Sequence, residues 1–357
     1  MTLDQNDLQT VTTAYAAPEA NADRIVLNGE ETPINARTAI VLREMRALLP
    51  DSHALKSTPI LIKSRNSFPT AAGLASSAAG YAAMVTALAG LYKLDFEATK
   101  IALSRIARQG SGSATRSLLG GVVAWQMGAR EDGSDSQAEQ IALESHWPTL
   151  EAIVCIASDR KKHVSSTSGM GTSLATSALL AYRASALVPT KFARMRQAIA
   201  SKNHALVFEL TMRDSNQFHA TCLDTYPPIF YMTDTSRSVV RLVDELNGNA
   251  PPRFAYTFDA GPNAVIFCDA KDTGELLEAV LRRFPPSKAE LRADADFLHV
   301  RGRTTRTRAQ VLDGIAHGAG KADAAAEEGA LMYVFHTGIG RGARVLEGDE
   351  AAARRLV

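Results

Sequence analysis

The chain has 357 residues, 46% of them apolar and 22% charged, which is typical of a globular protein and enough for roughly two domains. Its formal net charge of +1 provides no overall field for nucleic acid, so any anion must be bound by a local site. No apolar run reaches the roughly 18 residues of a membrane helix, and the opening MTLDQNDLQTVTT has no basic segment followed by an apolar one. We therefore expect a cytosolic protein with neither a membrane nor a nucleic-acid partner.

The first half predicts a mixed domain. Alternating patterns in LQTVTTAY and PILIKSR indicate two or three strands around a helix at Ile34–Leu49. Small and apolar residues predict a buried helix over Leu74–Leu91, and Asp95 is the expected N-cap of a helix that ends at Gly110. A Gly/Ser turn and a strand follow. The polar segment Glu131–Pro148 is the expected connection between two domains.

The second half predicts a strand at Ala152–Ala157, several helices, and then two strands close together in the sequence. Those two strands are expected at Arg253–Phe258 and Ala264–Cys268, followed by a helix at Gly274–Phe284 and a last strand at Ala330–His336. This β-α-β-β-α-β order is the split, ferredoxin-like arrangement. We interpret the arginine-rich stretch around residues 292–308 as a solvated basic loop.

Cysteines and histidines point away from disulfides and metal sites. The three cysteines, Cys155, Cys222 and Cys268, lie far apart without CxxC spacing, and two of them stand in apolar runs. We expect reduced core residues of an intracellular protein. The eight histidines show no metal-ligand spacing, and we interpret His163 and His219 as structural.

The segment from Asn66 to Tyr81, NSFPTAAGLASSAAGY, has the composition of a phosphate-binding loop. Small residues allow backbone N–H groups to approach an anion, Ser76 and Ser77 add hydroxyls, and the following helix directs its positive dipole end to the same place. The alternative is a helix N-terminus that is rich in Gly and Ser without binding anything.

Two further places carry polar side chains suited to chemistry. Ser111, Ser113 and Arg116 can converge on an anion if the turn curls as Gly110 and Gly112 allow, although a surface turn with a solvated arginine is the alternative. Asp259 follows the apolar strand FAYTF and leads into Ala-Gly-Pro-Asn, where a lone Asp is often only a turn residue.

Ser165, Ser166 and Thr167 offer hydroxyls where a strand leads into a helix. Ordinary helix capping explains such a group at least as well as ligand binding. We carry Ser165 as an expected substrate contact.

Five stretches resemble one family: NSFPTAAGLASSAAGYAA, SRIARQGSGSATRSLLGG, SSTSGM, MRDSNQFHATCLDTYPPIFYM and YTFDAGPNAV. They are similar to mevalonate diphosphate decarboxylase, of the superfamily that includes galactokinase, homoserine kinase, mevalonate kinase and phosphomevalonate kinase. The resemblance implies an α+β protein of two domains with the site in the cleft between them. Residues 1–148 would form an ATP-binding domain like ribosomal protein S5, and residues 149–357 a ferredoxin-like domain.

The resemblance also implies an activity, the ATP-dependent decarboxylation of mevalonate 5-diphosphate to isopentenyl diphosphate, with ADP, phosphate and carbon dioxide as co-products. The protein would be a homodimer of the isoprenoid and sterol pathway that uses ATP with Mg²⁺. A kinase that phosphorylates a mevalonate derivative without decarboxylation is a weaker alternative.

Site residues follow from the matching positions. ATP would be bound by Pro69, Gly73, Leu74, Ala75, Ser76, Ser77 and Ala78. Phosphate oxygens and water would hold most of the Mg²⁺, with Ser77 as the one protein group beside it. By resemblance Asp259 would be the catalytic aspartate and Arg116 would orient the substrate carboxylate, with Ser111 and Ser113 as substrate contacts.

The printed chain departs from the family at its start. Members normally open with a stretch resembling Ala-Pro-x-Asn-Ile-Ala-x-x-Lys-Tyr-Trp-Gly-Lys, and no such stretch precedes MTLDQNDLQTVTTA here. We expect either a working decarboxylase whose start is misassigned, or, if the product exists as written, a weakened or inactive nucleotide-binding remnant.

Overall fold

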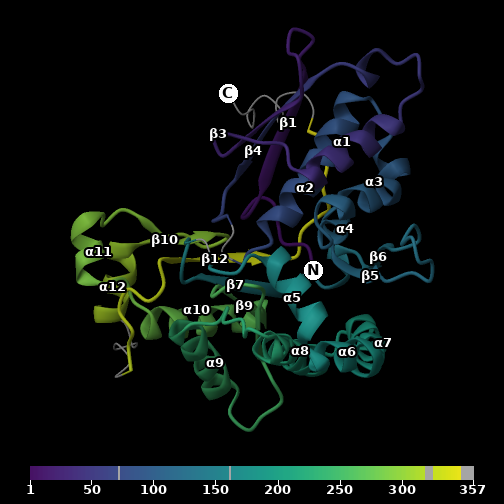
Figure 1. Ribbon diagram of the computed structural model, residues 1–357. Coiled ribbons are helices and arrows are strands. Elements are labelled where there is room, and N and C mark those ends of the chain that lie inside the picture. The colour runs from purple at the N-terminus through teal and green to yellow at the C-terminus, as the bar shows by residue number, and fades with distance from the viewer. Residues whose placement is uncertain (71–72, 161, 318–324, 347–357) are drawn as a thin grey trace. The chain divides into compact units, whose positions relative to one another are not determined.

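The computed structural model describes residues 1–70, 73–160, 162–317 and 325–346, which form two compact units (Figure 1). Unit 1 contains Met1–Pro69, Ala75–His146 and the C-terminal residues from Ile339. Unit 2 contains Thr70–Leu74 and Trp147–Gly338. The protein is therefore an α+β protein of two domains, and each unit carries part of the chain that is distant in sequence from the rest of it.

Unit 1 has a four-stranded sheet in the order β1-β4-β2-β3. Its strands are β1 (Thr10–Ala16), β2 (Arg24–Leu27), β3 (Glu30–Thr32) and β4 (Ile60–Asn66). Strands β1 and β4 pair antiparallel from Thr10 opposite Asn66 to Ala16 opposite Ile60, whereas β2 runs parallel to β4. A separate hairpin-like sheet pairs β5 (Val122–Gln126) with β6 (Gln137–Ala142).

Helices cover one side of the four-stranded sheet (Figure 1). They are α1 (Ala36–Ala47), α2 (Ser76–Leu91), α3 (Phe96–Gly110) and the short α4 (Ala114–Ser117), with a 3-10 turn at Ala54–Lys56. Helix α2 carries no charged residue, and its Val85 and Leu88 are fully buried against Met45 of α1 and Ile62 of β4. Asp95 accepts a hydrogen bond from the Ala98 N–H at 3.0 Å, which confirms the predicted N-cap of α3.

The polar segment Glu131–Pro148 contains the predicted division between the two units, but most of it is not a simple linker. Residues Gln137–Ala142 form strand β6, because backbone pairing with β5 satisfies their hydrogen bonds in spite of their polar side chains. The division between the units falls at His146 and Trp147, whereas the sequence division assigned residues 1–148 and 149–357 to the two domains.

Unit 2 has a six-stranded sheet in the order β11-β10-β12-β7-β9-β8. The strands are β7 (Leu150–Ile156), β8 (Phe254–Phe258), β9 (Ala264–Asp269), β10 (Leu298–Gly302), β11 (Arg306–Thr307) and β12 (Tyr333–Gly338). Strands β7, β8, β9 and β12 lie as β12-β7-β9-β8 with antiparallel neighbours, which is the predicted split β-α-β arrangement. The expectation of a basic loop around residues 292–308 was wrong, since Val300 of β10 is buried and pairs with β12.

Helices of unit 2 fall into two groups. Between β7 and β8 come α5 (Ser166–Thr176), α6 (Ala178–Tyr182), a π-turn at Arg183–Leu187, α7 (Val188–Ala200), α8 (His204–Asp224) and α9 (Asp234–Asn247). After β9 come a 3-10 turn at Ala270–Asp272, α10 (Thr273–Arg283), α11 (Lys288–Ala293) and α12 (Arg308–His317). Helices α9 and α10 pack on the same face of the sheet (Figure 1), where Val243, Val280 and Phe284 are fully buried with Phe254 and Ile266.

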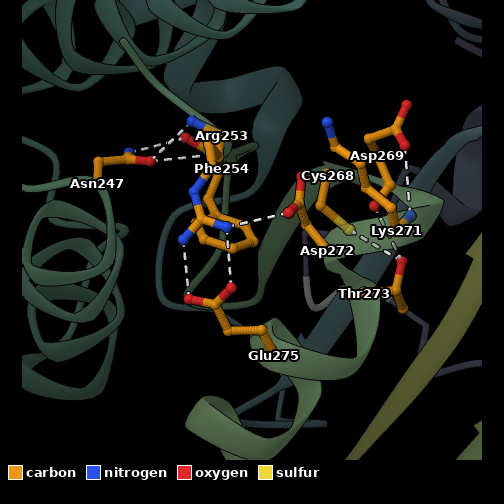
Figure 2. Close-up of polar contacts among 9 residues, drawn as sticks. All are labelled: Asn247, Arg253, Phe254, Cys268, Asp269, Lys271, Asp272, Thr273 and Glu275. Atoms are coloured by element: carbon orange, nitrogen blue, oxygen red, sulfur yellow. Dashed lines mark hydrogen bonds and ion pairs between the residues drawn. The ribbon is translucent and has the colours of Figure 1, made fainter. Parts of the chain in front are cut away.

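Polar contacts tie the sheet to these helices. Arg253, just before β8, forms ion pairs with Asp272 and Glu275 at the start of α10 (Figure 2).

The three cysteines are free and buried, as the sequence predicted. Among the described residues, no helix is both long and apolar enough to cross a membrane.

Candidate active site

Two serines that are distant in sequence meet in unit 1. The hydroxyl oxygens of Ser77, in the first turn of α2, and Ser111, just after α3, lie 3.3 Å apart. Tyr81 and Gly110 set this approach: a Cβ on Gly110 would lie 2.2 Å from the Tyr81 ring, so only glycine lets α3 end against that ring. Because Tyr81 is one helical turn after Ser77, this packing fixes the distance between the serines.

The N-terminus of α2 is open to an anion. The N-cap residue Ala75 has left-handed backbone angles (φ 53°), and its methyl side chain makes no capping hydrogen bond. The first backbone N–H groups of a helix have no partner within it and carry the positive end of its dipole. Together with the Ser77 and Ser111 hydroxyls they form a donor set suited to phosphate oxygens.

Arg116 and Ser113 follow the same turn. Ser113 is the N-cap residue of α4 without a capping hydrogen bond from its side chain, and the Arg116 guanidinium lies 5.6 Å from the centre of the Trp125 ring. A Cβ on Gly112 would lie 2.7 Å from that ring. The indole on β5 thus requires glycine in the turn and supports the guanidinium from one side.

The segment Thr70–Leu74 belongs to unit 2, where Gly73 packs directly on Gly261. A Cβ on Gly73, whose φ is +85°, would lie 2.8 Å from the Gly261 Cα, so this is a contact between two backbones. Gly261 stands two residues after Asp259. The structure therefore brings a predicted ATP-loop residue into contact with the turn that carries the predicted catalytic aspartate.

Asp259 is the first residue after β8 and is exposed. Its Oδ1 accepts a hydrogen bond from the Ala260 N–H at 2.8 Å, and its carbonyl accepts one from Gly261 at 2.8 Å. Ser236 donates to the Pro262 carbonyl at 2.9 Å, and Ser215 accepts from the Phe258 N–H at 3.0 Å. The turn is thus held from both sides by buried hydroxyls, which leaves the carboxylate rigidly placed.

Lys162 is a site residue that the sequence analysis missed. Its Nζ donates to the Ser166 hydroxyl at 2.7 Å and to the Ala260 carbonyl, and lies 5.3 Å from the centre of the Tyr231 ring. Burial lowers the pKa of Lys162, and the nearby Asp259 carboxylate partly offsets that effect. The only sequence signal was a lysine placed four residues before Ser166, at the start of a helix.

Ser165 is the N-cap of α5. Its hydroxyl accepts a hydrogen bond from the Ser168 N–H at 3.1 Å, so the capping alternative describes this contact. Its carbonyl lies 3.4 Å from the Tyr231 hydroxyl, which donates to it.

His219 is buried on α8, and burial lowers its pKa, so the ring is neutral at pH 7. Within the described ranges no three His, Cys, Asp or Glu side chains are grouped to hold a metal.

Comparisons with known proteins cover both units. Residues 1–138 match the model of the diphosphomevalonate decarboxylase-like N-terminal domain, and residues 152–346 match that of the mevalonate 5-diphosphate decarboxylase C-terminal domain. A diphosphomevalonate decarboxylase of Ganoderma lucidum is 45% identical over 98% of this chain and 89% of its own length. The chain belongs to the diphosphomevalonate decarboxylase family.

Solved structures of this decarboxylase family have the same fold. Mevalonate diphosphate decarboxylase from Trypanosoma brucei superposes with a TM-score of 0.83 at 31% identity, covering 98% of this chain and 89% of that chain. A further structure, described as a complex with MVAPP, AMPPCP and magnesium, superposes with a TM-score of 0.69 at 25% identity over 96% of this chain and 89% of that one.

In this member of the family, the predicted site residues form two clusters. One, in unit 1, contains Ser77 and Ser111 in contact, with Ser113 and Arg116 in the turn that follows. The other, in unit 2, contains Asp259 with Lys162, and Gly73 in contact with the Asp259 turn. Ser76 and Ala78 lie in the first turn of α2, after Ala75. Pro69 belongs to unit 1, and Leu74 belongs to the short segment of unit 2 that follows it.

Proposed function

We propose that this chain catalyses the ATP-dependent decarboxylation of mevalonate 5-diphosphate to isopentenyl diphosphate, with release of ADP, phosphate and carbon dioxide. The observation that carries the proposal is the match of both units to one family of decarboxylases, at 45% identity to a curated member over nearly the whole chain. The relative in complex with MVAPP, AMPPCP and magnesium supports ATP and Mg²⁺ as the other reactants.

The N-terminus of α2 would bind the ATP phosphates. The first N–H groups of α2 and the Ser77 hydroxyl provide donors, and Ala75 beside them carries only a methyl group. Mg²⁺, when bound to the phosphates, neutralises their charge during transfer. The hydroxyl of Ser77 suits that ion, and its remaining ligands would be phosphate and water oxygens.

Asp259 would accept the proton of the tertiary hydroxyl as its oxygen attacks the γ-phosphorus of ATP and the bond to ADP breaks. Two bonds then break in turn. The tertiary C–O bond releases phosphate with its electron pair, which leaves positive charge on that carbon. The C–C bond to the carboxylate then supplies the electrons of the new double bond, and carbon dioxide departs. Phosphorylation thus turns a hydroxyl into a leaving group.

Three other residues are proposed to hold the reactants. The Arg116 guanidinium, supported by Trp125, can bind the substrate carboxylate through paired hydrogen bonds. The hydroxyls of Ser111 and Ser113 are proposed as substrate contacts near it. Lys162, beside Asp259, would help to hold the Asp259 turn in place through its hydrogen bond to the Ala260 carbonyl.

Ser165 remains a proposed substrate contact, but only as a hydrogen-bond donor. Its hydroxyl oxygen already accepts the capping hydrogen bond from Ser168, but a hydroxyl can donate at the same time. A diphosphate oxygen could therefore accept from Ser165 without breaking the cap.

The test is an assay of the purified chain with ATP, Mg²⁺ and mevalonate 5-diphosphate that measures phosphate and carbon dioxide together. We expect equal amounts of both products from the wild type and a loss of at least about 10³-fold in Asp259→Ala. A stable phosphorylated acid without carbon dioxide would instead show a kinase. No turnover at all, with ATP binding retained, would show a nucleotide-binding remnant.

The wider setting is proposed on the family resemblance. We propose a homodimer in the cytosol that serves the isoprenoid and sterol pathway. Analytical ultracentrifugation at micromolar concentration should give twice the mass of 38.2 kDa, and a monomer at that concentration would contradict the dimer. Fractionation of the source cells would test the location.

A further inference from the structure

We propose that Asn263 is a positioning residue. It holds the backbone of Ala157 and Ser158, which leads to Lys162 (the Lys162 segment), against the turn from Asp259 to Asn263 (the Asp259 turn). This inference rests on the proposed function of Asp259. Asn263 ends the turn, and only 1% of its surface is exposed. Its Oδ1 accepts hydrogen bonds from the N–H groups of Ala157 at 2.7 Å and Ser158 at 3.1 Å. Its Nδ2 donates to the Ser158 carbonyl at 3.0 Å.

These three hydrogen bonds continue the sheet beyond the point where backbone pairing between its strands ends. The ladder between β7 and β9 ends with Cys155 opposite Ala264. Beyond it, no strand of the described residues faces the backbone of Ala157 and Ser158 on that side, and the amide of Asn263 takes the place of one. A buried amide that satisfies two N–H groups and one carbonyl fixes the backbone it binds, because each group left unpaired would cost about 1–3 kcal/mol.

The clamp links the two segments that carry charge. Ser158 leads toward Lys162, four residues later, and Asn263 closes the turn that begins at Asp259. Lys162 in turn donates to the Ala260 carbonyl of that turn. The segments are therefore joined at two points, of which Asn263 is the buried one and Lys162 the partly exposed one. Without Asn263, only the hydrogen bond from Lys162 to the Ala260 carbonyl joins the segment to the turn, and the position of the ammonium relative to the Asp259 carboxylate is held less firmly.

The chain contains a matched control for this clamp. Asn247, at the end of α9, accepts hydrogen bonds from the N–H groups of Arg253 at 3.0 Å and Phe254 at 3.1 Å, and donates to the Phe254 carbonyl at 2.9 Å (Figure 2). The pattern is the same as at Asn263, but it lies at the start of β8, whereas Asp259 follows its end. A purely structural effect of losing such a clamp should appear at both positions.

The experiment compares Asn263→Ala with Asn247→Ala at a temperature where both are folded by circular dichroism. We expect kcat to fall roughly 10- to 100-fold in Asn263→Ala, with the KM for ATP changed less than about 3-fold, because a misplaced catalytic group slows chemistry more than binding. Asn247→Ala should keep kcat within about 2-fold of the wild type even if it is less stable. Equal losses of kcat in both variants, or a wild-type kcat in Asn263→Ala, would overturn the proposal.

A second measurement does not depend on activity. Reductive methylation with ¹³C labels each lysine for NMR titration, and Lys162→Arg identifies the signal of Lys162. In Asn263→Ala the pKa of Lys162 should move toward that of a free lysine, whereas in Asn247→Ala it should stay at its lowered value. An unchanged titration in Asn263→Ala would contradict the proposal. An inactive wild type would contradict only the proposed reaction.

Should Asn263→Ala fail to fold, Asn263→Asp replaces it, compared with Asn247→Asp. The carboxylate keeps an acceptor for both N–H groups and loses only the donor to the Ser158 carbonyl. We expect the same direction of change in kcat and in the Lys162 titration, and wild-type values for both would again overturn the proposal.

Discussion

Ser77 and Ser111 place their hydroxyl oxygens 3.3 Å apart although 34 residues separate them in the chain. One hydroxyl belongs to the first turn of α2 and the other follows the last residue of α3. The Tyr81 ring packs directly against Gly110, and this contact sets the distance between the two helix ends. The pair is therefore a product of helix packing and can be tested as a unit.

Ser77→Ala should raise the KM for ATP roughly 10-fold, since a hydrogen bond to a charged phosphate contributes about 1.5–3 kcal/mol. Ser111→Ala should have a smaller effect of the same sign. Because the two hydroxyls touch, the double variant should lose less than the sum of the single changes in free energy. Steady-state kinetics with Ser185→Ala, on the exposed π-turn, as control checks this, and strict additivity would show that the serines act separately.

Lys162 should give activity and stability opposite pH dependences. Burial lowers the pKa of its ammonium below the 10.5 of a free lysine. As pH rises through the lowered pKa, the charge beside Asp259 is lost, and kcat should fall. Between that pKa and 10.5 the unfolded chain binds more protons than the folded one, so the free energy of unfolding should rise with pH.

Lys162→Met separates the two effects. It should lower kcat roughly 100-fold and remove the alkaline limb of the pH profile, whereas Lys271→Met, an exposed lysine, should leave both unchanged. Urea unfolding at pH 8 and 10 checks the stability side. An alkaline limb that persists in Lys162→Met would assign it to another group.

Glu151 should make unit 2 sensitive to acid. Burial alone would raise the pKa of this carboxyl, but hydrogen bonds from His336 at 2.9 Å and Thr273 at 2.7 Å, with Arg303 at 2.8 Å, hold it at about 2. The folded pKa is thus below the 4.5 of a free glutamate, so the stabilisation is complete above pH 4.5 and is lost as pH falls toward 2.

Glu151→Gln should therefore lower the free energy of unfolding by up to about 3 kcal/mol at pH 7, and the difference from wild type should shrink below pH 4.5. Glu97→Gln, from an exposed pair with Lys100, should change it by less than about 0.5 kcal/mol. Urea titrations at pH 7 and pH 4 measure both. A difference that does not depend on pH would show that the glutamate acts through packing alone.

The cysteines should be inert while the protein is folded. Burial raises the pKa of the Cys155 and Cys268 thiols to about 12 and that of Cys222 to about 11, so almost no thiolate exists at pH 8. Iodoacetamide should label none of them in the native protein and all of them in 6 M guanidinium. Rapid native labelling of Cys222 on α8, whose pKa Asp259 also raises, would show that this part of the unit opens locally.

Local patterns predicted much of the fold. The apolar run at Ala152–Ala157 predicted the strand β7, and Asp95 predicted the start of α3, because caps and burial act within a few residues. Strand β6 and strand β10 were missed for one reason. Their side chains are polar or charged at many positions, and only pairing with a distant strand makes them regular.

The site divides in the same way. Ser77 and Asp259 could be named because each lies in a motif of adjacent residues. Lys162 could not, since its partner Ala260 is 98 residues away and contributes only a backbone carbonyl. The contact of Gly73 with Gly261 was also beyond prediction, because a glycine carries no sign of what approaches it.

The amide of Asn247 has a consequence for how this protein ages. Asn247 precedes Gly248, and an asparagine followed by the small residue glycine is prone to deamidation, in which the glycine nitrogen attacks the side-chain amide carbon. Here the amide is held by Arg253 and Phe254, and the Gly248 N–H donates to the Asp244 carbonyl at 2.9 Å. The side-chain amide and the glycine nitrogen are thus both hydrogen-bonded in the folded chain. We therefore expect Asn247 to deamidate slowly during storage, although its sequence alone would predict rapid deamidation.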